Sequence, residues 1–166
     1  MHIETERKFL VRGDSYKSAA IRADHIKQGY IAHDSGNTVR VRIRDGEGWL
    51  TIKGKSSLGG MSRPEWEKEI PLADAEALLG LCIGGLIEKV RYIVPAGDTV
   101  SSGGKIAERF FEVDEFLGDN AGLVMAEIEI GDASEIFARP AWLGEEVTGD
   151  KRYYNSYLTE HPFKNW

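Results

Sequence analysis

Charged side chains of one sign recur at every second position along several segments of this sequence. The basic members of these sets are Lys8, Arg40, Arg42, Arg44, Lys53, Lys89 and Arg91, and the acidic members are Glu4, Glu6, Glu65, Glu67, Glu112, Asp114, Glu127 and Glu129. Guanidinium and ammonium groups hold phosphate oxygens, and clustered carboxylates hold hard divalent cations. Brought together, the two sets predict a site for a triphosphate and its metal ion.

A period of two places each set on one side of an extended strand. Apolar residues occupy the other side, as Val39, Val41 and Ile43 do between the three arginines. Eight segments show such alternation, with glycine and aspartate turn signals between them. The expected strands are 3–11, 27–32, 38–44, 48–55, 65–71, 88–94, 105–114 and 123–130, and the expected helices are 73–79, 132–138 and 151–159.

Two features favour a closed barrel over an open sheet with one solvated face. Like charges cluster within single strands, whereas a surface that serves solubility alone mixes the signs. The helices are also too short to cover the apolar face of an open eight-stranded sheet. We therefore expect a mainly β (α+β) fold: a closed eight-stranded antiparallel β-barrel with a charged tunnel and a few short helices outside. For any single strand, a solvated face remains the alternative.

The overall composition indicates one domain, residues 1–166, that acts on a small molecule. A net charge of −6 disfavours nucleic acid as a partner, and no apolar run is long enough to span a membrane. Cys82 is the one cysteine, so no internal disulfide forms. The charged segment after Met1 lacks the features of a signal peptide, and we expect a cytoplasmic protein. Outward-facing apolar strand residues are compatible with a homodimer.

Other common catalytic motifs are missing from the sequence. Gly54-Lys55-Ser56 lacks the upstream glycine that a phosphate-binding P-loop requires. The four histidines are scattered, without the spacing of zinc ligands. No Gly-x-Ser-x-Gly elbow is present for a serine nucleophile. The alternating charges therefore carry the functional interpretation.

Glu4-Thr5-Glu6-Arg7-Lys8 forms an ExExK motif at the start of the chain. The basic pairs follow it in order, then come Glu127-Ile128-Glu129 and the run 142–153. In this order the motifs resemble the CYTH domain, also called the triphosphate tunnel metalloenzyme family, and in particular its short bacterial tripolyphosphatase members. The resemblance covers essentially the whole chain. It implies a triphosphate lying in the tunnel with a divalent metal ion, Mg²⁺ or Mn²⁺.

The same resemblance implies a role for each charged set. The residues are, for the metal, Glu4, Glu6 and Glu129; for the phosphates, Lys8, Arg40, Arg42, Arg44, Lys53, Lys89 and Arg91; and for acidic support, Glu65, Glu67, Glu112, Asp114 and Glu127. Gln28-Gly29-Tyr30 also resembles the short members, in which a tyrosine beside the signature lysine takes part in hydrolysis. Lys8 and Tyr30 are therefore the candidate catalytic residues. The alternative for Tyr30 is a strand aromatic that packs under a loop.

Metal-dependent hydrolysis of inorganic tripolyphosphate is the leading interpretation of these residues. The same site would suit an adenylyl cyclase of the CYTH type, which makes cyclic AMP from ATP, or a general nucleoside or organic triphosphatase. A barrel that binds a polyanion without catalysis is the remaining alternative. It explains the acidic set least well, because phosphate capture alone does not need so many carboxylates.

Overall fold

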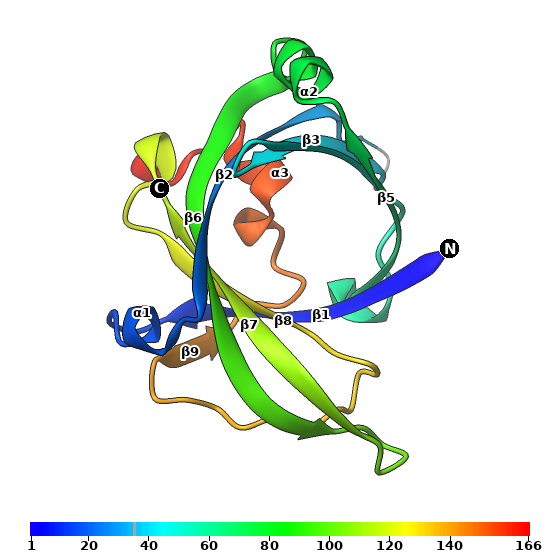
Figure 1. Cartoon of the computed structure of the whole chain (residues 1–166), viewed down its shortest axis with the longest axis vertical. Helices are drawn as coiled ribbons and strands as arrows, with labels where there is room; N and C mark the ends of the chain where they lie inside the picture. Colours follow the sequence, from blue (N-terminus) through cyan, green and yellow to red (C-terminus); the bar gives the residue numbers. More distant parts are fainter. Residues whose placement is uncertain (35) are drawn as a thin grey trace.

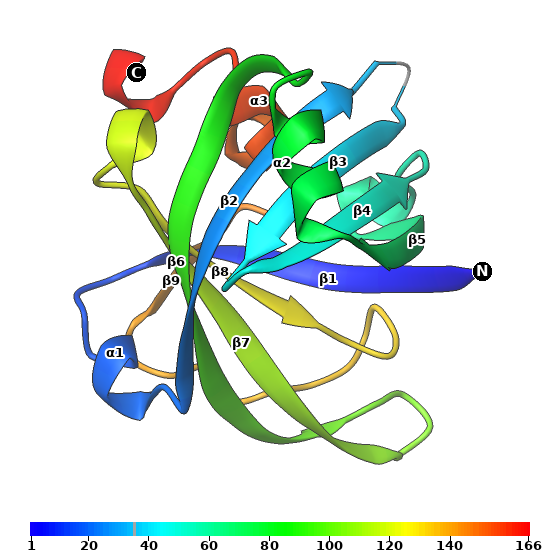
Figure 2. The same ribbon diagram turned by 45° about the horizontal axis from the view of Figure 1, so that its top comes forward.

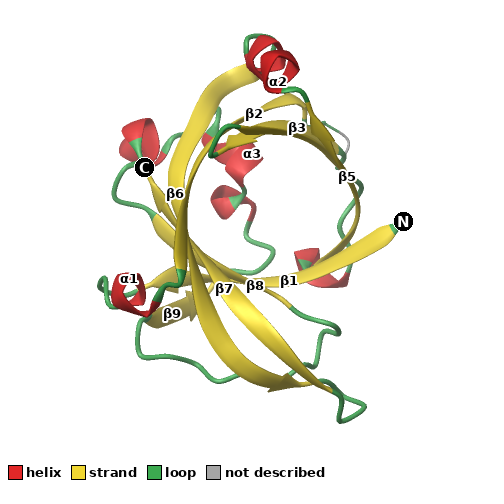
Figure 3. Ribbon diagram, viewed as in Figure 1, coloured by secondary structure: helices red, strands yellow, loops and turns green. Residues whose placement is uncertain are grey.

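The computed structural model describes residues 1–34 and 36–166 (Figure 1), and strands dominate it (Figure 3). The strands are β1 (His2–Val11), β2 (Arg22–Ala32), β3 (Thr38–Arg44), β4 (Glu47–Lys53), β5 (Ser62–Ile70), β6 (Ile83–Val100), β7 (Ile106–Phe116), β8 (Val124–Glu129) and β9 (Leu143–Glu146). The helices are α1 (Tyr16–Ala19), α2 (Leu72–Leu79) and α3 (Asn155–Leu158), with 3-10 turns at Leu58–Gly60, Gly118–Asn120, Lys151–Tyr153 and Phe163–Asn165. No helix in the described ranges is long and apolar enough to cross a membrane.

The first eight strands form a closed antiparallel barrel. Backbone hydrogen bonds join them in the order β5-β4-β3-β2-β6-β7-β8-β1, and β1 returns to β5 through pairs from His2↔Glu65 to Thr5↔Ser62. The ring is visible in Figure 1. β9 pairs with β1 near Phe9 and Val11, beyond the segment that closes the barrel. The fold class expected from the alternating pattern is confirmed.

Each of the eight expected strands corresponds to an observed one, and β2, β6 and β7 are longer than expected. β6 continues past an irregularity between Pro95 and Gly97, and with β7 it forms a hairpin that extends beyond the barrel (Figure 2). The expected helix at 132–138 is wrong. Ile136 instead exchanges backbone hydrogen bonds with Val100 at the end of this hairpin, which satisfies groups that a helix would have paired internally.

Burial of the apolar sets on the outer wall determines which side of each strand faces the lumen. Val41 of β3 packs against Ala75 and Leu79 of α2, which covers the β2–β4 part of the wall. Elsewhere, Phe111 of β7 packs edge-on against Trp142, with ring centroids 5.1 Å apart. A shift of any strand by one residue would turn its apolar side chains inward, so this burial fixes the register.

The C-terminal segment lies across one opening of the barrel. Leu158 of α3 belongs to a buried cluster with Ile87, Phe116 and Met125, which fill that end of the lumen. α3 appears inside the ring in Figure 1. Of the helices expected outside the barrel, α2 lies there, but α3 does not. It packs into the opening because these inward-facing apolar side chains need a partner.

Candidate active site in the barrel lumen

A cavity of about 70 Å³ lies within the lumen and is lined by half of the predicted residues. These are Glu6, Lys8, Tyr30, Arg40, Lys53, Lys89, Arg91 and Glu127. Residues that the sequence reasoning did not select complete the wall, namely Thr38, Gly60, Arg63, Thr148, Gly149, Tyr154, Asn155 and Ser156. A second cavity of about 430 Å³ adjoins it, and Thr38, Arg63, Tyr154 and Ser156 line both.

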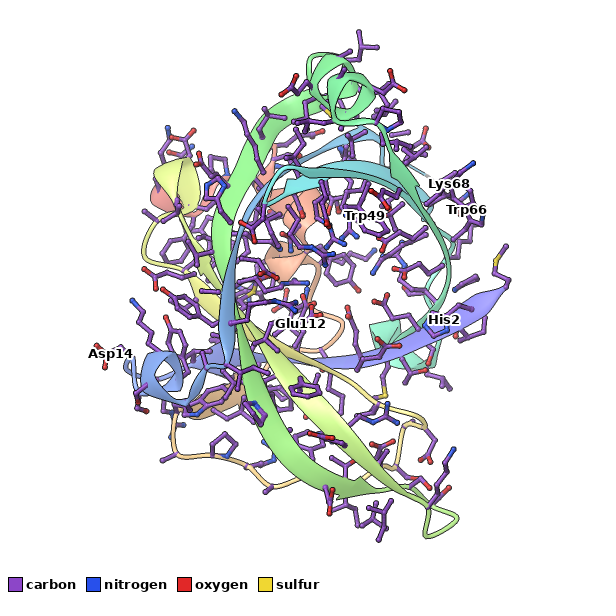
Figure 4. The ribbon with its side chains drawn as sticks, in the orientation of Figure 1. His2, Asp14, Trp49, Trp66, Lys68 and Glu112 are labelled. Atoms are coloured by element: carbon purple, nitrogen blue, oxygen red, sulfur yellow. The ribbon has the colours of Figure 1, made fainter. Side chains whose placement is uncertain are left out.

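Strand alternation accounts for the lining. Trp49 and Glu112 point into the ring in Figure 4, whereas Trp66 and Lys68 lie on the outside of the wall. The same period of two brings Glu4, Glu6 and Lys8 of β1 to the inner side. The neighbouring Phe9 points to the other side of β1 and is fully buried in the hydrophobic cluster that contains Phe111 and Trp142. The prediction that the charged sides face inward is consistent with this arrangement.

Lys53 of β4 connects two acidic strands. Its Nζ lies 2.5 Å from Glu4 and 3.1 Å from Glu65. Burial opposes the charge on Lys53, but Glu6 and Glu4 outweigh it and raise the lysine pKa to about 12. Lys53 therefore stays protonated and holds the carboxylates of Glu4 and Glu65 in place.

Asp114 of β7 anchors a pair of cations on β6. Arg91 donates to it through Nε and a terminal nitrogen at 2.7 and 2.8 Å, and Lys89 lies 2.7 Å from the same carboxylate. Arg91 also pairs with Glu112. Burial lowers the pKa of Lys89 to about 8 in spite of this partner. Asp114 thus orients Lys89 and Arg91, the two phosphate-binding candidates on β6.

Arg40 and Arg42 of β3 share one acidic partner. Each lies 3.4 Å from Glu67, which also accepts a 2.6 Å hydrogen bond from Thr51. Burial lowers the pKa of Arg42 to about 10, and the nearby Arg40 and Arg91 add to the shift. The Nε atoms of both arginines are buried without a hydrogen-bond partner among the described residues. Buried donors of this kind are costly, and oxygens of an anion would satisfy them.

Lys8 lies between β8 and the C-terminal segment. Its Nζ is 3.2 Å from Glu127 and donates to the backbone carbonyl of Tyr153 at 3.2 Å, with the Tyr154 ring centroid 5.3 Å away. Burial opposes the charge, but Glu127 and Glu6 outweigh it and raise the Lys8 pKa. The lysine is therefore a fixed cation at the wall of the cavity.

Glu6 is the carboxylate whose surroundings best fit a metal ion. Burial raises its pKa to about 8, and the charge of Glu127 adds to the shift. Within residues 1–34 and 36–166, no cationic side chain forms an ion pair with it. Burial likewise raises the pKa of Glu4. Such crowded carboxylates suit a hard divalent cation.

In the part of the chain that the structure describes, no three His, Cys, Asp or Glu side chains are arranged to hold a metal by themselves. A metal at Glu6 would therefore take further oxygen ligands from substrate or water, as is usual for Mg²⁺. The carboxylates of Glu4 and Glu6 therefore fit a divalent metal ion, although they do not complete its coordination by themselves.

Eight predicted residues do not line the small cavity, namely Glu4, Arg42, Arg44, Glu65, Glu67, Glu112, Asp114 and Glu129. Glu129 is the last residue of β8, and its side chain is 54% exposed and lies 3.0 Å from His2 at the start of β1. Arg44 pairs with Glu47 at 3.7 Å, and its guanidinium lies over the Trp49 ring. Glu112 pairs with Arg91, and its side chain is 43% exposed.

Tyr30 is buried and lines the cavity. The residue before it, Gly29, has no room for a side chain. A Cβ at position 29 would lie 2.7 Å from Cys82 Sγ and from a Leu86 methyl carbon. Glycine therefore lets β2 approach the chain near Cys82 closely, with Gln28 and Tyr30 both on the inner side.

The lining residues that sequence reasoning missed lie mainly at 148–156. The run 142–153 supported the family resemblance, but no residue spacing indicated that the following segment re-enters the barrel. Asn155 is the clearest case, because its Oδ1 accepts hydrogen bonds from Lys89 at 2.9 Å and Gln28 at 3.1 Å. Asparagine after a turn has no signature of a site in sequence.

Comparisons with known proteins agree with this geometry. An inorganic triphosphatase of Acetivibrio thermocellus is 47% identical over 165 residues, which cover 98% of this chain and 97% of that protein. An inorganic triphosphatase of Nitrosomonas europaea is 36% identical over 159 residues, which cover 93% and 95%.

Solved structures and the family comparison lead to the same assignment. A crystal structure of an inorganic triphosphatase is 30% identical and covers 96% of this chain and 95% of its own, with a TM-score of 0.59. A Pyrococcus horikoshii protein with 22% identity, covering 78% and 79%, shares the fold with the same TM-score. The CYTH domain matches residues 2–155, and membership implies a divalent metal ion. The chain belongs to the CYTH domain family.

Proposed function

We propose that this chain hydrolyses inorganic tripolyphosphate to orthophosphate and pyrophosphate with the help of Mg²⁺ or Mn²⁺. The proposal is carried by an observation in the lumen: among the described residues, the buried Nε donors of Arg40 and Arg42 have no partner and Glu6 forms no ion pair. An anion alone would satisfy the arginines and a cation alone the carboxylate, whereas a metal–triphosphate complex satisfies both. The names of the two similar bacterial proteins support the choice of substrate.

Each charged set has a role in this proposal. Glu4 and Glu6 would hold the metal from β1, and Glu129 would contribute from the end of β8. The phosphate oxygens would be bound by Lys8, Arg40, Arg42, Arg44, Lys53, Lys89 and Arg91. The supporting carboxylates Glu65, Glu67, Glu112, Asp114 and Glu127 keep these cations oriented.

The reaction is attack of water on a terminal phosphorus atom, with cleavage of the bond to the bridging oxygen. The metal ion, when bound, neutralises phosphate charge and orients water. The buried cations stabilise the charge that spreads over the phosphoryl oxygens, because the lumen already holds them in place. Lys8 and Tyr30 both line the cavity and are the catalytic candidates.

We assign this activity to the whole chain, residues 1–166, as one CYTH-like domain in the cytoplasm. The outer wall exposes Ile52 and Trp66, which are directly paired on β4 and β5. An exposed apolar pair of this kind would suit a homodimer, and sedimentation of the purified chain tests that assembly.

An organic triphosphate is the second candidate substrate. The adjoining cavity of about 430 Å³ is large enough for a base and contains the stacked rings of Tyr157 and His161, 4.2 Å apart. ATP would then be hydrolysed, or cyclised to cyclic AMP if its ribose hydroxyl replaced water.

Phosphate release from tripolyphosphate and ATP, measured side by side, tests the proposed function. Reactions contain Mg²⁺ or Mn²⁺, with EDTA as the control, and ATP reactions are also assayed for cyclic AMP. We expect metal-dependent release that strongly favours tripolyphosphate. A preference for ATP would transfer the assignment to an organic triphosphatase, and cyclic AMP would indicate a cyclase. Binding without any product would indicate a polyanion-binding barrel.

A further inference from the structure

Gln28 belongs to a series of polar contacts that ends at Tyr30. Its side chain is fully buried, and its Nε2 lies 3.1 Å from Asn155 Oδ1 and 3.4 Å from the Tyr30 hydroxyl. Asn155 Oδ1 in turn lies 2.9 Å from Lys89 Nζ, which is 2.7 Å from Asp114. The contacts thus connect the tyrosine on β2 with a buried ion pair on β6 and β7.

Lys89 determines the direction of each hydrogen bond from Asn155 to Tyr30. An ammonium group only donates, so the Asn155 atom that faces Lys89 must be the amide oxygen. The Gln28 atom that faces the same oxygen must then be nitrogen, because two oxygens would repel each other. Both N–H bonds of that nitrogen are used, one toward Asn155 and one toward Tyr30.

The other Gln28 amide atom supports this assignment. Gln28 Oε1 is buried and has no hydrogen-bond partner among the described residues. Leaving a buried acceptor unpaired costs about 1–3 kcal/mol. Turning the amide over would bring this oxygen against Asn155 Oδ1, which can only accept. The contact to Asn155 therefore imposes the orientation, whereas the Tyr30 hydroxyl could accept or donate.

Because the Tyr30 oxygen accepts from Gln28, its own proton points elsewhere. No acceptor for that proton is present among the described residues, and Tyr30 lines the 70 Å³ cavity. We propose that Gln28 and Asn155 are positioning residues that fix Tyr30 as a hydrogen-bond donor toward a phosphate oxygen of the substrate. The proposal rests on the proposed function and adds the direction in which the Tyr30 proton acts.

Gln28 is the only glutamine in the sequence, which gives the orientation a direct spectroscopic test. Selective ¹⁵N labelling of glutamine makes its two side-chain amide protons the single NH₂ pair in the spectrum. We expect Tyr30→Phe to shift one of these protons and Asn155→Leu to shift the other. Asn165→Leu, at the C-terminal end, is the matched control and leaves both unchanged. Failure of Tyr30→Phe to move either proton overturns the proposal.

Kinetics then test the consequence for the reaction. Gln28→Glu removes the donor to Tyr30 while keeping the shape, and we expect kcat on tripolyphosphate to fall about tenfold with KM nearly unchanged. In a Tyr30→Phe background the same change should cost less than about twofold, since its effect passes through the hydroxyl. Asn155→Asp retains the acceptor for Lys89 and Gln28 and should restore most of the kcat that Asn155→Leu loses.

An equal loss from Gln28→Glu in both backgrounds contradicts a role through Tyr30. Thermal melting of each variant separates these effects from unfolding. If the wild-type chain released no phosphate from tripolyphosphate, the proposed function would fail, and the amide proton shifts would still decide the orientation of Tyr30.

Discussion

Glu6 and Arg42 show how strongly the lumen disfavours its own charges at single residues. Burial raises the pKa of the Glu6 carboxyl to about 8 and lowers that of the Arg42 guanidinium to about 10. Both shifts favour the neutral form, even though oppositely charged side chains line the same lumen. A ligand that brings negative charge to the arginine and positive charge to the glutamate reverses both penalties. These two residues therefore lead to predictions for the pH dependence of stability and for the affinity of the chain for tripolyphosphate.

Glu6→Gln should alter how stability depends on pH. The pKa of about 8 in the folded chain lies above the ordinary 4.5, so the folded state keeps a proton that the unfolded chain loses. Stability consequently falls as pH rises from 4.5 to 8, by at most about 1.4 kcal/mol per pH unit from this group. Urea unfolding in EDTA should show that the variant gains stability over wild type across this window. A difference that does not change with pH would contradict the assigned environment.

Arg42→Ala should weaken binding of tripolyphosphate. Hydrogen bonds to charged groups contribute about 1.5–3 kcal/mol, which corresponds to a tenfold or greater rise in Kd. Calorimetric titration with tripolyphosphate and Mg²⁺ measures it, and Arg12→Ala on the exposed segment after β1 is the control. Equal affinities for the two variants would count against an inward-facing phosphate clamp.

At the scale of elements, two loops meet at the cavity wall with unusually close backbones. A Cβ at Gly149 would lie 2.1 Å from the carbonyl oxygen of Gly59, and Gly149 has a positive φ of +79°. Gly60 and Gly149 both line the cavity. The contact holds the segment that carries Thr148 and Tyr154 against the 3-10 turn at Leu58–Gly60.

Gly149→Ala should separate these loops and lower turnover. Gly13→Ala is the matched control, since Gly13 has a φ of +65° but no atom within 4 Å of an added Cβ. Each substitution costs about 1–2 kcal/mol because alanine must adopt a left-handed backbone, and only Gly149→Ala adds a steric clash. The melting temperature and the rate of phosphate release should therefore fall more in Gly149→Ala than in Gly13→Ala. Similar values for both variants would show that the loop contact does not support the site.

The elements also show what sequence patterns can and cannot predict. Strand alternation predicted the barrel and the inward side of Glu6, Lys8 and Lys53, because a period of two is a local property of the chain. The helix expected at 132–138 was wrong, because a distant partner, Val100, pairs with Ile136. Asn155 was missed for the same reason: its place depends on how the C-terminal segment packs into the barrel.

At the scale of the whole molecule, barrel closure makes a charged interior possible. The chain carries a net charge of −6, yet its lumen gathers buried lysines and arginines against matching carboxylates. Closure leaves the outer sides of the strands to form the apolar cores, which then fix the register of the inner sides. Global charge therefore indicated little about the site, whereas the order of charges along each strand indicated most of it.

The central claim is that metal-dependent hydrolysis takes place among these inward-facing charges. Phosphate release from tripolyphosphate with Mg²⁺ by wild type, Glu6→Gln and Glu76→Gln tests it in one measurement, since Glu76 lies exposed on α2. We expect wild type and Glu76→Gln to turn over at similar rates and Glu6→Gln to lose activity at least a hundredfold while remaining folded. Full activity in Glu6→Gln would contradict the account.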